Sequence, residues 1–224
     1  MKEATRIIRY PRRTEAGFSL VELLIVIVVI GIASAMVLPQ LISSRRQFRS
    51  AGIPREIVTQ LRLARQLAMS GQQAVTFQYD NANKQIVIIR HQTASGTRQS
   101  GIAALTDANY PNNGVKAPAT LLTGFGVSAA DLVYGRPPGA LTNPLTDGTT
   151  MTPLVNNVIN ITFQPDGSVL KATGNPAVLT TDDHALFIYN GLAASSTASA
   201  VSVLGSAGRV KLWRYNSNAN AYVE

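Results

Sequence analysis

Hydrophobic residues form a continuous run near the N-terminus and shorter periodic patterns beyond it. No charged residue occurs between Leu23 and Leu38, and the run reaches back to Phe18 with Glu22 as its one charge. As a helix, the segment from Phe18 to Leu38 would be about 31 Å long, close to the hydrocarbon thickness of a bilayer. The pattern predicts a transmembrane or assembly helix over residues 18–39.

Residues 40–71 are predicted to continue as an amphipathic helix. Apolar positions spaced by four, three and four residues fall on one helical face: Ile57, Leu61, Ala64 and Ala68. Gly52 and Pro54 interrupt the pattern, so we expect the amphipathic part to start there. Ser50 would then be its cap, and Gly71 is a plausible end.

After residue 71 the period changes to two, which is typical of strands. Residues 75–79 and 85–91 flank a turn at 81–84 and predict a hairpin. Strand patterns return at 158–164, 185–189, 200–204 and 209–215, with a Pro-Asp-Gly-Ser turn at 165–168. Residues 192–200 are expected to form a loop.

Residues 92–157 are rich in Gly, Pro, Thr and Asn and show little periodicity. We interpret them as a loop-rich insertion with short strands at most. Residues 72–224 are therefore expected to form an antiparallel β-sheet domain with this insertion. The fold class is α+β, with a long N-terminal hydrophobic helix whose face at residues 57–68 packs on the sheet.

Composition and charge narrow the function classes. There is no cysteine, which excludes disulfides, thiolate metal sites and thiol nucleophiles. The net charge of +8 comes from the two flanks of the apolar run, residues 1–17 and 40–70, while residues 71–224 are nearly neutral. This distribution argues against a domain built for general nucleic-acid binding, which would carry its basic charge itself.

Three interpretations of the apolar run compete. A secretory signal peptide would use the cleavage site Ala33-Ser34-Ala35, and a plain membrane anchor would need no cleavage. Neither accounts for Glu22, because an ionised carboxylate inside an apolar segment costs roughly 2.5–3.5 kcal/mol on insertion scales. A cut before Phe18 would create an α-amino group that can pair with that carboxylate, in the same chain or in a neighbouring copy.

The stretch Gly17-Phe18-Ser19-Leu20-Val21-Glu22 resembles the processing site of type IV prepilins and type II secretion pseudopilins. The resemblance implies a cytoplasmic leader at 1–17, cleavage between Gly17 and Phe18, and N-methylation of Phe18 by prepilin peptidase/methyltransferase. It also implies that Glu22 registers subunits during assembly. Gly31 and Pro39 match positions where many pilins have helix-weakening residues.

The body also resembles one group of this superfamily. The segments L-R-L-A-R-Q-L-A (61–68), A-V-T-F-Q-Y (74–79), I-T-F-Q-P-D-G-S (161–168) and G-R-V-K-L (208–212) are similar to the GspH/FimT minor pseudopilins and pilins. The likeness covers roughly the first ninety and the last seventy residues and leaves out the insertion. It implies an inner-membrane protein with its globular domain outside the cytoplasm, which contacts lipid and then other subunits in a pilus or pseudopilus.

No catalytic constellation is apparent, so we expect no enzyme, cofactor or metal site. His91 and His184 lie far apart in the sequence and are expected to be exposed or strand-end residues. The glycines of residues 124–129 match a dinucleotide-binding pattern but lack its βαβ context, so we interpret them as turn glycines. Asp182 and Asp183 suggest calcium only weakly, since adjacent acids in a loop are usually solvated.

Arg209, Lys211, Trp213 and Tyr215 alternate along the last long strand and should share one face. Arg209, Lys211 and Trp213 are possible DNA contacts, because bases can stack on aromatic rings beside cations. Some FimT-type pilins are linked to DNA uptake through a similar C-terminal motif. The other interpretation is an exposed strand face with Trp213 partly packed.

The arginines Arg45, Arg46 and Arg49 have their own interpretation. They are expected to contact lipid headgroups or to pair with acids of neighbouring subunits.

The sequence therefore predicts a minor pseudopilin or pilin subunit that supports secretion or pilus biogenesis. Two alternatives stay open: a DNA-binding minor pilin in DNA uptake, and a secreted globular protein cleaved after Ala35.

Overall fold

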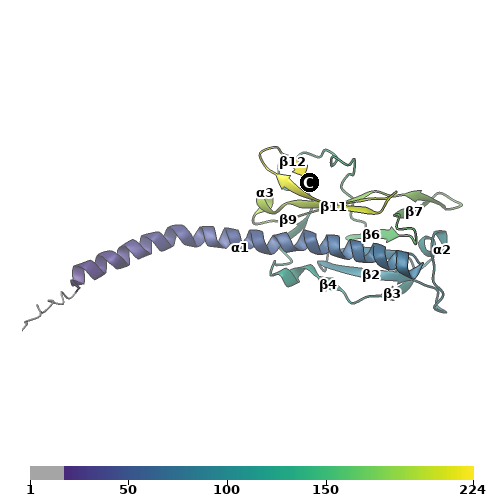
Figure 1. Cartoon of the computed structure of the whole chain (residues 1–224), viewed down its shortest axis with the longest axis horizontal. Coiled ribbons are helices and arrows are strands. Elements are labelled where there is room, and N and C mark those ends of the chain that lie inside the picture. The colour runs from purple at the N-terminus through teal and green to yellow at the C-terminus, as the bar shows by residue number, and fades with distance from the viewer. Residues whose placement is uncertain (1–17) are drawn as a thin grey trace, which may run out of the picture. The chain divides into compact units, whose positions relative to one another are not determined.

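The computed structural model describes residues 18–224 (Figure 1), so the predicted leader and Gly17 lie outside the described residues. The chain divides into two units, residues 1–42 and 43–224. The helix α1 (Leu20–Gly71) contributes its first part to one unit and its second part to the other. We call the second unit the body.

In the first unit, α1 contains the segment Leu20–Val37, which is long and apolar enough to cross a membrane by length and composition. Its mean hydropathy is 2.8, and none of it is buried. The helix passes through Gly31 and Pro39 without a break. The boundary that we placed after residue 39 therefore remains a prediction about function and does not mark the end of a helix.

Within the body, α1 also runs through Gly52 and Pro54, where we expected a new helix to start. This expectation was wrong because Gly52 serves packing: a Cβ there would lie 2.7 Å from Cδ1 of Phe125. Ser50 does not begin a helix, and its hydroxyl instead accepts a hydrogen bond from the amide of Asn190 at 3.3 Å. The glycine therefore lets a loop of the body approach the helix closely.

The body contains two five-stranded antiparallel sheets and a separate hairpin, where the sequence led us to expect one sheet. In the first sheet the order is β3-β2-β1-β6, with β4 also paired to β2: β1 (Val75–Asp80), β2 (Gln85–His91), β3 (Gly114–Lys116), β4 (Thr120–Leu121) and β6 (Val158–Phe163). In the second the order is β12-β11-β10-β9-β5: β5 (Leu132–Tyr134), β9 (His184–Asn190), β10 (Ser199–Leu204), β11 (Arg209–Asn216) and β12 (Ala221–Val223). The hairpin pairs β7 (Leu170–Thr173) with β8 (Val178–Thr181).

The predicted hairpin at 75–91 is present, with Val75 paired to Arg90 and Asp80 to Gln85. The insertion is loop-rich with short elements, as predicted, but it is integrated into both sheets. It supplies β3 and β4 to the first sheet and β5 to the second, together with α2 (Ile102–Leu105) and the 3-10 turn η1 (Leu122–Phe125). A one-turn helix, α3 (Ala194–Thr197), lies in the segment expected to be a loop.

The apolar face of α1 covers the core, as predicted. Ile57, Leu61, Ala64 and Ala68 are fully buried in one cluster with side chains of both sheets, including Phe77 of β1 and Val201 of β10. A second cluster lies on the other side of the second sheet and contains Phe187, Trp213 and Tyr222. The predicted α+β class, with an apolar N-terminal helix followed by antiparallel sheet, is confirmed.

Candidate functional site

The N-terminal end of α1 presents the residues that carry the processing motif. Phe18 is 78% exposed, and the large apolar side chains that follow it up to Val37 are each at least 45% exposed. Glu22 lies in the first helical turn. A carboxylate there is favoured by the unpaired N–H groups and the positive end of the helix dipole. The segment thus combines one acid with a long unpartnered apolar surface.

The start of α1 also places Glu22 at a helical position that we had not predicted. Leu23 N donates to Ser19 O at 3.1 Å, so Ser19 occupies the N-cap position. Glu22 is then the third helical residue, and Ser-x-x-Glu at these positions is the capping-box pattern. The spacing was readable from the sequence. The acid therefore occupies the position at which a capping box has its glutamate.

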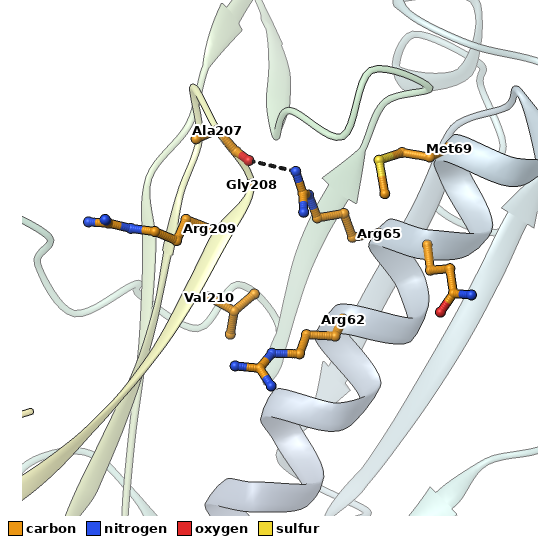
Figure 2. A pocket seen from close by; sticks show the side chains of 8 residues that line it. Arg62, Arg65, Met69, Ala207, Gly208, Arg209 and Val210 are labelled. Atoms are coloured by element: carbon orange, nitrogen blue, oxygen red, sulfur yellow. Dashed lines mark hydrogen bonds between the residues drawn. The ribbon is translucent and has the colours of Figure 1, made fainter.

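In the body, two of the motifs that carried the GspH/FimT resemblance, at 61–68 and 208–212, line one cleft of about 600 Å³, and the motif at 161–168 contacts both. Arg65 of α1 donates from Nε to Gly167 O at 3.2 Å and from Nη2 to Ala207 O at 3.1 Å. Figure 2 shows Arg62 and Arg65 reaching from α1 toward the turn before β11. Arg65 therefore holds two distant turns against the helix.

The G-R-V motif requires a glycine at position 208 for a steric reason. Gly208 has a φ of +57°, and a Cβ there would collide with the carbonyl oxygen of Gly167. Only glycine adopts this conformation without cost and allows the two backbones to touch. The motifs at 61–68, 161–168 and 208–212 thus share a structural function, which is to lock two turns onto α1.

The strand β11 alternates as predicted, but one of its faces is covered. Val210 and Leu212 pack toward the main cluster, whereas Trp213 and Tyr215 belong to the second cluster. Trp213 is only 2% exposed and donates from Nε1 to Ser202 Oγ at 2.8 Å. This corrects the prediction that Trp213 could stack on a base.

Of the two other predicted DNA contacts on that face, Lys211 already has partners within the body and Arg209 does not extend toward α1. Lys211 pairs with Glu224 at 2.7 Å and lies 5.0 Å from the Trp213 ring centroid. Arg209 is exposed, and in Figure 2 it extends away from α1. The cover comes from the insertion, because Ser202 Oγ donates to Asp147 Oδ2 at 2.6 Å. Strand periodicity alone did not reveal this cover.

Comparison with known proteins bears on the N-terminal segment. Residues 12–38 match the family model described as the prokaryotic N-terminal methylation motif. This chain carries a prepilin-type methylation motif. The match confirms the resemblance to the type IV pilin and pseudopilin superfamily predicted from residues 17–22, and it covers a short part of the chain.

Among solved structures, this chain is similar to two crystal structures of the type IV minor pilin FimU from Pseudomonas aeruginosa, in space groups P21 and P65. Both share 16% identity over 72% of this chain. The alignments cover 86% and 90% of the two FimU chains, with TM-scores of 0.37 and 0.36. At these values the likeness does not identify the role of this chain. No curated protein sequence matches it.

The two histidines of this chain lie at strand ends, as predicted, but both are buried. His91 Nδ1 donates to Asn113 Oδ1 at 2.8 Å, because the Asn113 amide is itself committed to the carbonyl of Ala104. His91 Nε2 then accepts from Thr76 Oγ1 at 2.6 Å. Burial lowers the pKa of His91 and outweighs the hydrogen bonds to the oxygens of Asn113, which raise it.

His184 is 6% exposed and joins a second polar cluster. Its Nε2 lies 3.1 Å from Asp182 Oδ2, and Lys171 Nζ lies 2.6 Å from the other oxygen of Asp182. Burial raises the pKa of Asp182, but hydrogen bonds from His184 and Lys171 together lower it by more, so the net shift is downward. Asp183 accepts a hydrogen bond from Gly205 N at 2.6 Å. Asp182 and Asp183 therefore both make contacts within the fold and are not simply solvated acids.

The glycines of residues 124–129 belong to a turn, and the described chain offers no metal site. Gly126 adopts a left-handed conformation with φ of +76° at the end of η1, as expected of a turn glycine. Among residues 18–224, no group of three histidine, aspartate or glutamate side chains is placed to hold a metal ion. The polar clusters of the described chain thus join loops to sheets.

Proposed function

We propose that this protein is a non-enzymatic minor pilin or pseudopilin subunit of the inner membrane. It is cleaved between Gly17 and Phe18, methylated at Phe18 and assembled into a type IV pilus or a type II secretion pseudopilus. The methylation motif at residues 12–38 carries the proposal. The wholly exposed apolar segment Leu20–Val37 supports it, because such a surface needs lipid or packed helices around it.

In the proposed cycle the body lies outside the cytoplasm while Leu20–Val37 anchors the precursor. Prepilin peptidase would act on the cytoplasmic side, and methylation keeps the new Phe18 amine protonated. Glu22 then pairs with that amine in a neighbouring subunit. Gly31 and Pro39 would let α1 adapt when it leaves the bilayer. The body motifs favour the GspH/FimT group.

Mass analysis of the native N-terminus tests the processing step. We expect a chain that starts at methylated Phe18. A chain that starts at Met36 would instead support secretion after cleavage at Ala35, and an uncleaved chain would support a plain anchor. Either of these results would overturn the proposal.

Two substitutions separate the assembly role of Glu22 from its capping role. Glutamine can complete a capping box but cannot form an ion pair. Glu22→Gln should therefore leave cleavage and helix content intact and reduce incorporation into filaments, measured by immunoblotting of sheared filaments. Ser19→Ala, which weakens the cap, should change incorporation much less. Normal incorporation of Glu22→Gln would contradict the pairing role.

A second candidate function, DNA binding by a minor pilin, is favoured by one observation. Two clefts between α1 and β11 contain five arginines and no acidic residue among their lining: Arg55, Arg62, Arg65, Arg209 and Arg214. Within the described chain, none of these arginines forms an ion pair. A cationic groove of this kind suits a phosphate backbone.

The groove arginines differ from the DNA contacts predicted from the sequence, which were Arg209, Lys211 and Trp213. A column assay distinguishes the two sets of residues. Retention on immobilised DNA should fall with salt and be lost in Arg62→Glu/Arg214→Glu. Lys211→Glu serves as the control, because Lys211 already has an acidic partner in Glu224. Retention that is absent, or unchanged by the double substitution, would contradict DNA binding through this groove.

A further inference from the structure

The C-terminal end of α1 and the loop after β2 border a cleft of about 400 Å³ with five polar side chains in its lining. Figure 1 shows this end of α1 beside β2 and β3. The polar lining residues are Ser70, Gln73, Arg90, Gln92 and Arg98. Within the described chain, none of these five side chains forms a hydrogen bond or an ion pair, and the lining contains no acid. The cleft therefore gathers hydrogen-bond donors that have no partner in the protein.

The way in which α1 ends places Gln73 in this lining. Gln72 adopts a left-handed conformation with φ of +51°, and Gln73 N donates to Ala68 O at 3.3 Å. This six-to-one bond is that of a Schellman helix end, which folds the chain back over the last turn. The Gln73 side chain lies against Gly71, where a Cβ would be 3.5 Å from its Cγ. Gln73 is only 7% exposed, so its amide is almost wholly buried without a hydrogen bond, which costs free energy unless a ligand supplies a partner.

Strand geometry puts three of the other donors on one face. Arg90 and Gln92 are two residues apart in extended chain, so their side chains point to the same side, opposite to that of His91. Arg98 forms an antiparallel bridge with Gln92, and residues paired in this way share a face. Gln99 N also donates to His91 O at 3.1 Å, which holds the returning segment against β2. The loop therefore fixes Arg98 beside Gln92 and diagonal to Arg90.

The cleft carries two positive charges that no acid of its lining compensates. Arg90 and Arg98 are both exposed, and guanidinium groups stay protonated at any physiological pH. Asp107 lines an adjoining pocket, but its two oxygens accept from Asn109 N at 2.9 Å and from Gln99 Nε2 at 3.3 Å. Two like charges on one face repel each other, and an anion bound between them removes this repulsion.

The set of donors indicates the class of anion. A carboxylate has one charge and two oxygens, which a single guanidinium satisfies in bidentate geometry. A phosphate group carries up to two charges and three or more free oxygens, so it can use two guanidiniums together with neutral donors. The volume of about 400 Å³ lies within the usual range for small-molecule sites, about 300–1,000 Å³.

We propose that this cleft binds a dianionic phosphate group, either inorganic phosphate or the phosphate of a small monoester. Arg90 and Arg98 supply the charge, and the buried amide of Gln73 donates to one oxygen from the floor of the cleft. Ser70 and Gln92 are placed to complete the set of donors. The inference goes beyond the proposed function, because it requires neither processing nor assembly of the chain.

An NMR titration of the full chain tests the proposal, in micelles of a maltoside detergent that contains no phosphate. The signals followed are the side-chain amide of Gln73 and the Nε–H groups of Arg90 and Arg98. Inorganic phosphate, added at constant ionic strength, should shift all three signals and saturate them with one dissociation constant. Sulfate, another tetrahedral dianion, should act in the same way. Acetate should require a concentration about tenfold higher, because it offers one charge and two oxygens.

Three variants assign the binding to this cleft. Arg98→Gln should weaken phosphate binding about tenfold or more, because a charged partner is lost. Gln73→Leu keeps every charge and should weaken binding about threefold or more through loss of the buried donor. Without phosphate it should be at least as stable as the unmodified protein, because the amide that it removes has no partner there. Arg62→Gln, which removes an exposed arginine from the separate cleft at β11, should leave the affinity within about twofold.

The other outcomes are equally decisive. Shifts that do not saturate, or that appear as strongly at Arg62 Nε–H, would indicate general ionic contact and overturn the site. Equal affinity for acetate would overturn the assignment to phosphate, and unchanged affinity in Gln73→Leu would overturn the assignment to this cleft. Glycerol 3-phosphate identifies the source: binding as tight as that of inorganic phosphate supports a monoester, and much weaker binding supports free phosphate.

Discussion

The guanidinium of Arg65 donates a hydrogen bond to the carbonyl oxygen of Gly167, 102 residues further along the chain. A second bond from the same side chain reaches Ala207, in the turn before β11. One side chain of α1 thus fixes the turns that follow β6 and β10. The arginine lies in the segment L-R-L-A-R-Q-L-A of residues 61–68, directly after the buried Ala64, and the spacing of the apolar residues did not predict its contacts.

Replacing this arginine should weaken the body. Arg65→Met should lower the free energy of unfolding by about 1–3 kcal/mol, because hydrogen bonds from a charged group to two carbonyls are lost. Urea unfolding followed by Trp213 fluorescence measures the change. Arg62→Met, one turn away and exposed, should stay within about 0.5 kcal/mol of the unmodified protein. Equal losses in both variants would contradict the clamp.

The close contact between two turns predicts an unusual sensitivity at Gly208. Gly208→Ala should cost more than about 3 kcal/mol, because left-handed strain of about 1–2 kcal/mol adds to a collision with the Gly167 backbone. Gly148 is the matched control, since its φ is +85° and a Cβ added there would meet nothing within 4 Å. Gly148→Ala should therefore cost only the strain. Thermal unfolding by circular dichroism gives both values, and similar losses would refute the steric argument.

Sequence periodicity was sufficient where one residue type dominates a face. The helical spacing of Ile57, Leu61 and Ala64 identified the buried side of α1, and the alternation around Phe77 identified the hairpin. The methylation motif was equally recognisable, because it is defined by one short linear segment, residues 12–38. These features depend on neighbours in the sequence.

Periodicity failed where distant segments decide the environment. Trp213 alternates with exposed residues, yet Asp147 and Leu145 of the insertion cover its face. Glycine is a residue type that weakens helices, but Gly52 lies within a continuous helix, where its lack of a side chain leaves room for the Phe125 ring. The pairing of β5 with β9 likewise depends on an insertion without regular spacing. Such contacts cannot be derived from a local pattern.

The buried indole reports on how the insertion docks. Ser202 Oγ accepts from Trp213 Nε1 and donates to Asp147, so Ser202→Ala leaves a buried N–H and a carboxylate without this partner. We expect a loss of about 1–3 kcal/mol and a red shift of Trp213 emission at low urea. Ser206→Ala, at an exposed turn position, is the control. An unshifted spectrum would argue against docking through this network.

Buried His91 predicts that stability falls on mild acidification. Thr76 Oγ1 donates to its Nε2 and is followed by a chain of hydroxyls, Thr162 at 2.7 Å and Tyr110 at a further 2.8 Å. Protonation at Nε2 would reverse every donor in this chain. Because burial lowers the pKa of His91 below the usual value of about 6.5, the unfolded chain binds more protons than the folded one near that pH.

The sign of the effect follows from this difference. Stability is complete above about pH 6.5 and decreases as the pH falls toward the lowered pKa of His91, by at most about 1.4 kcal/mol per pH unit. The carboxylates with lowered pKa, such as Asp147 and Asp182, lose their contribution only below about pH 4, so the two windows are separate. Urea midpoints between pH 5 and 7.5 measure the slope.

Two variants of the same network isolate the titration from simple loss of packing. His91→Gln should be less stable at pH 7.5 and should show a shallower dependence on pH, because the titrating group is gone. Tyr110→Phe removes the terminal donor to Thr162 while His91 stays buried, so it should lower stability and keep the slope of the unmodified protein. If His91→Gln retains that slope, another group is responsible for the acid sensitivity, and the protonation of His91 has no part in it.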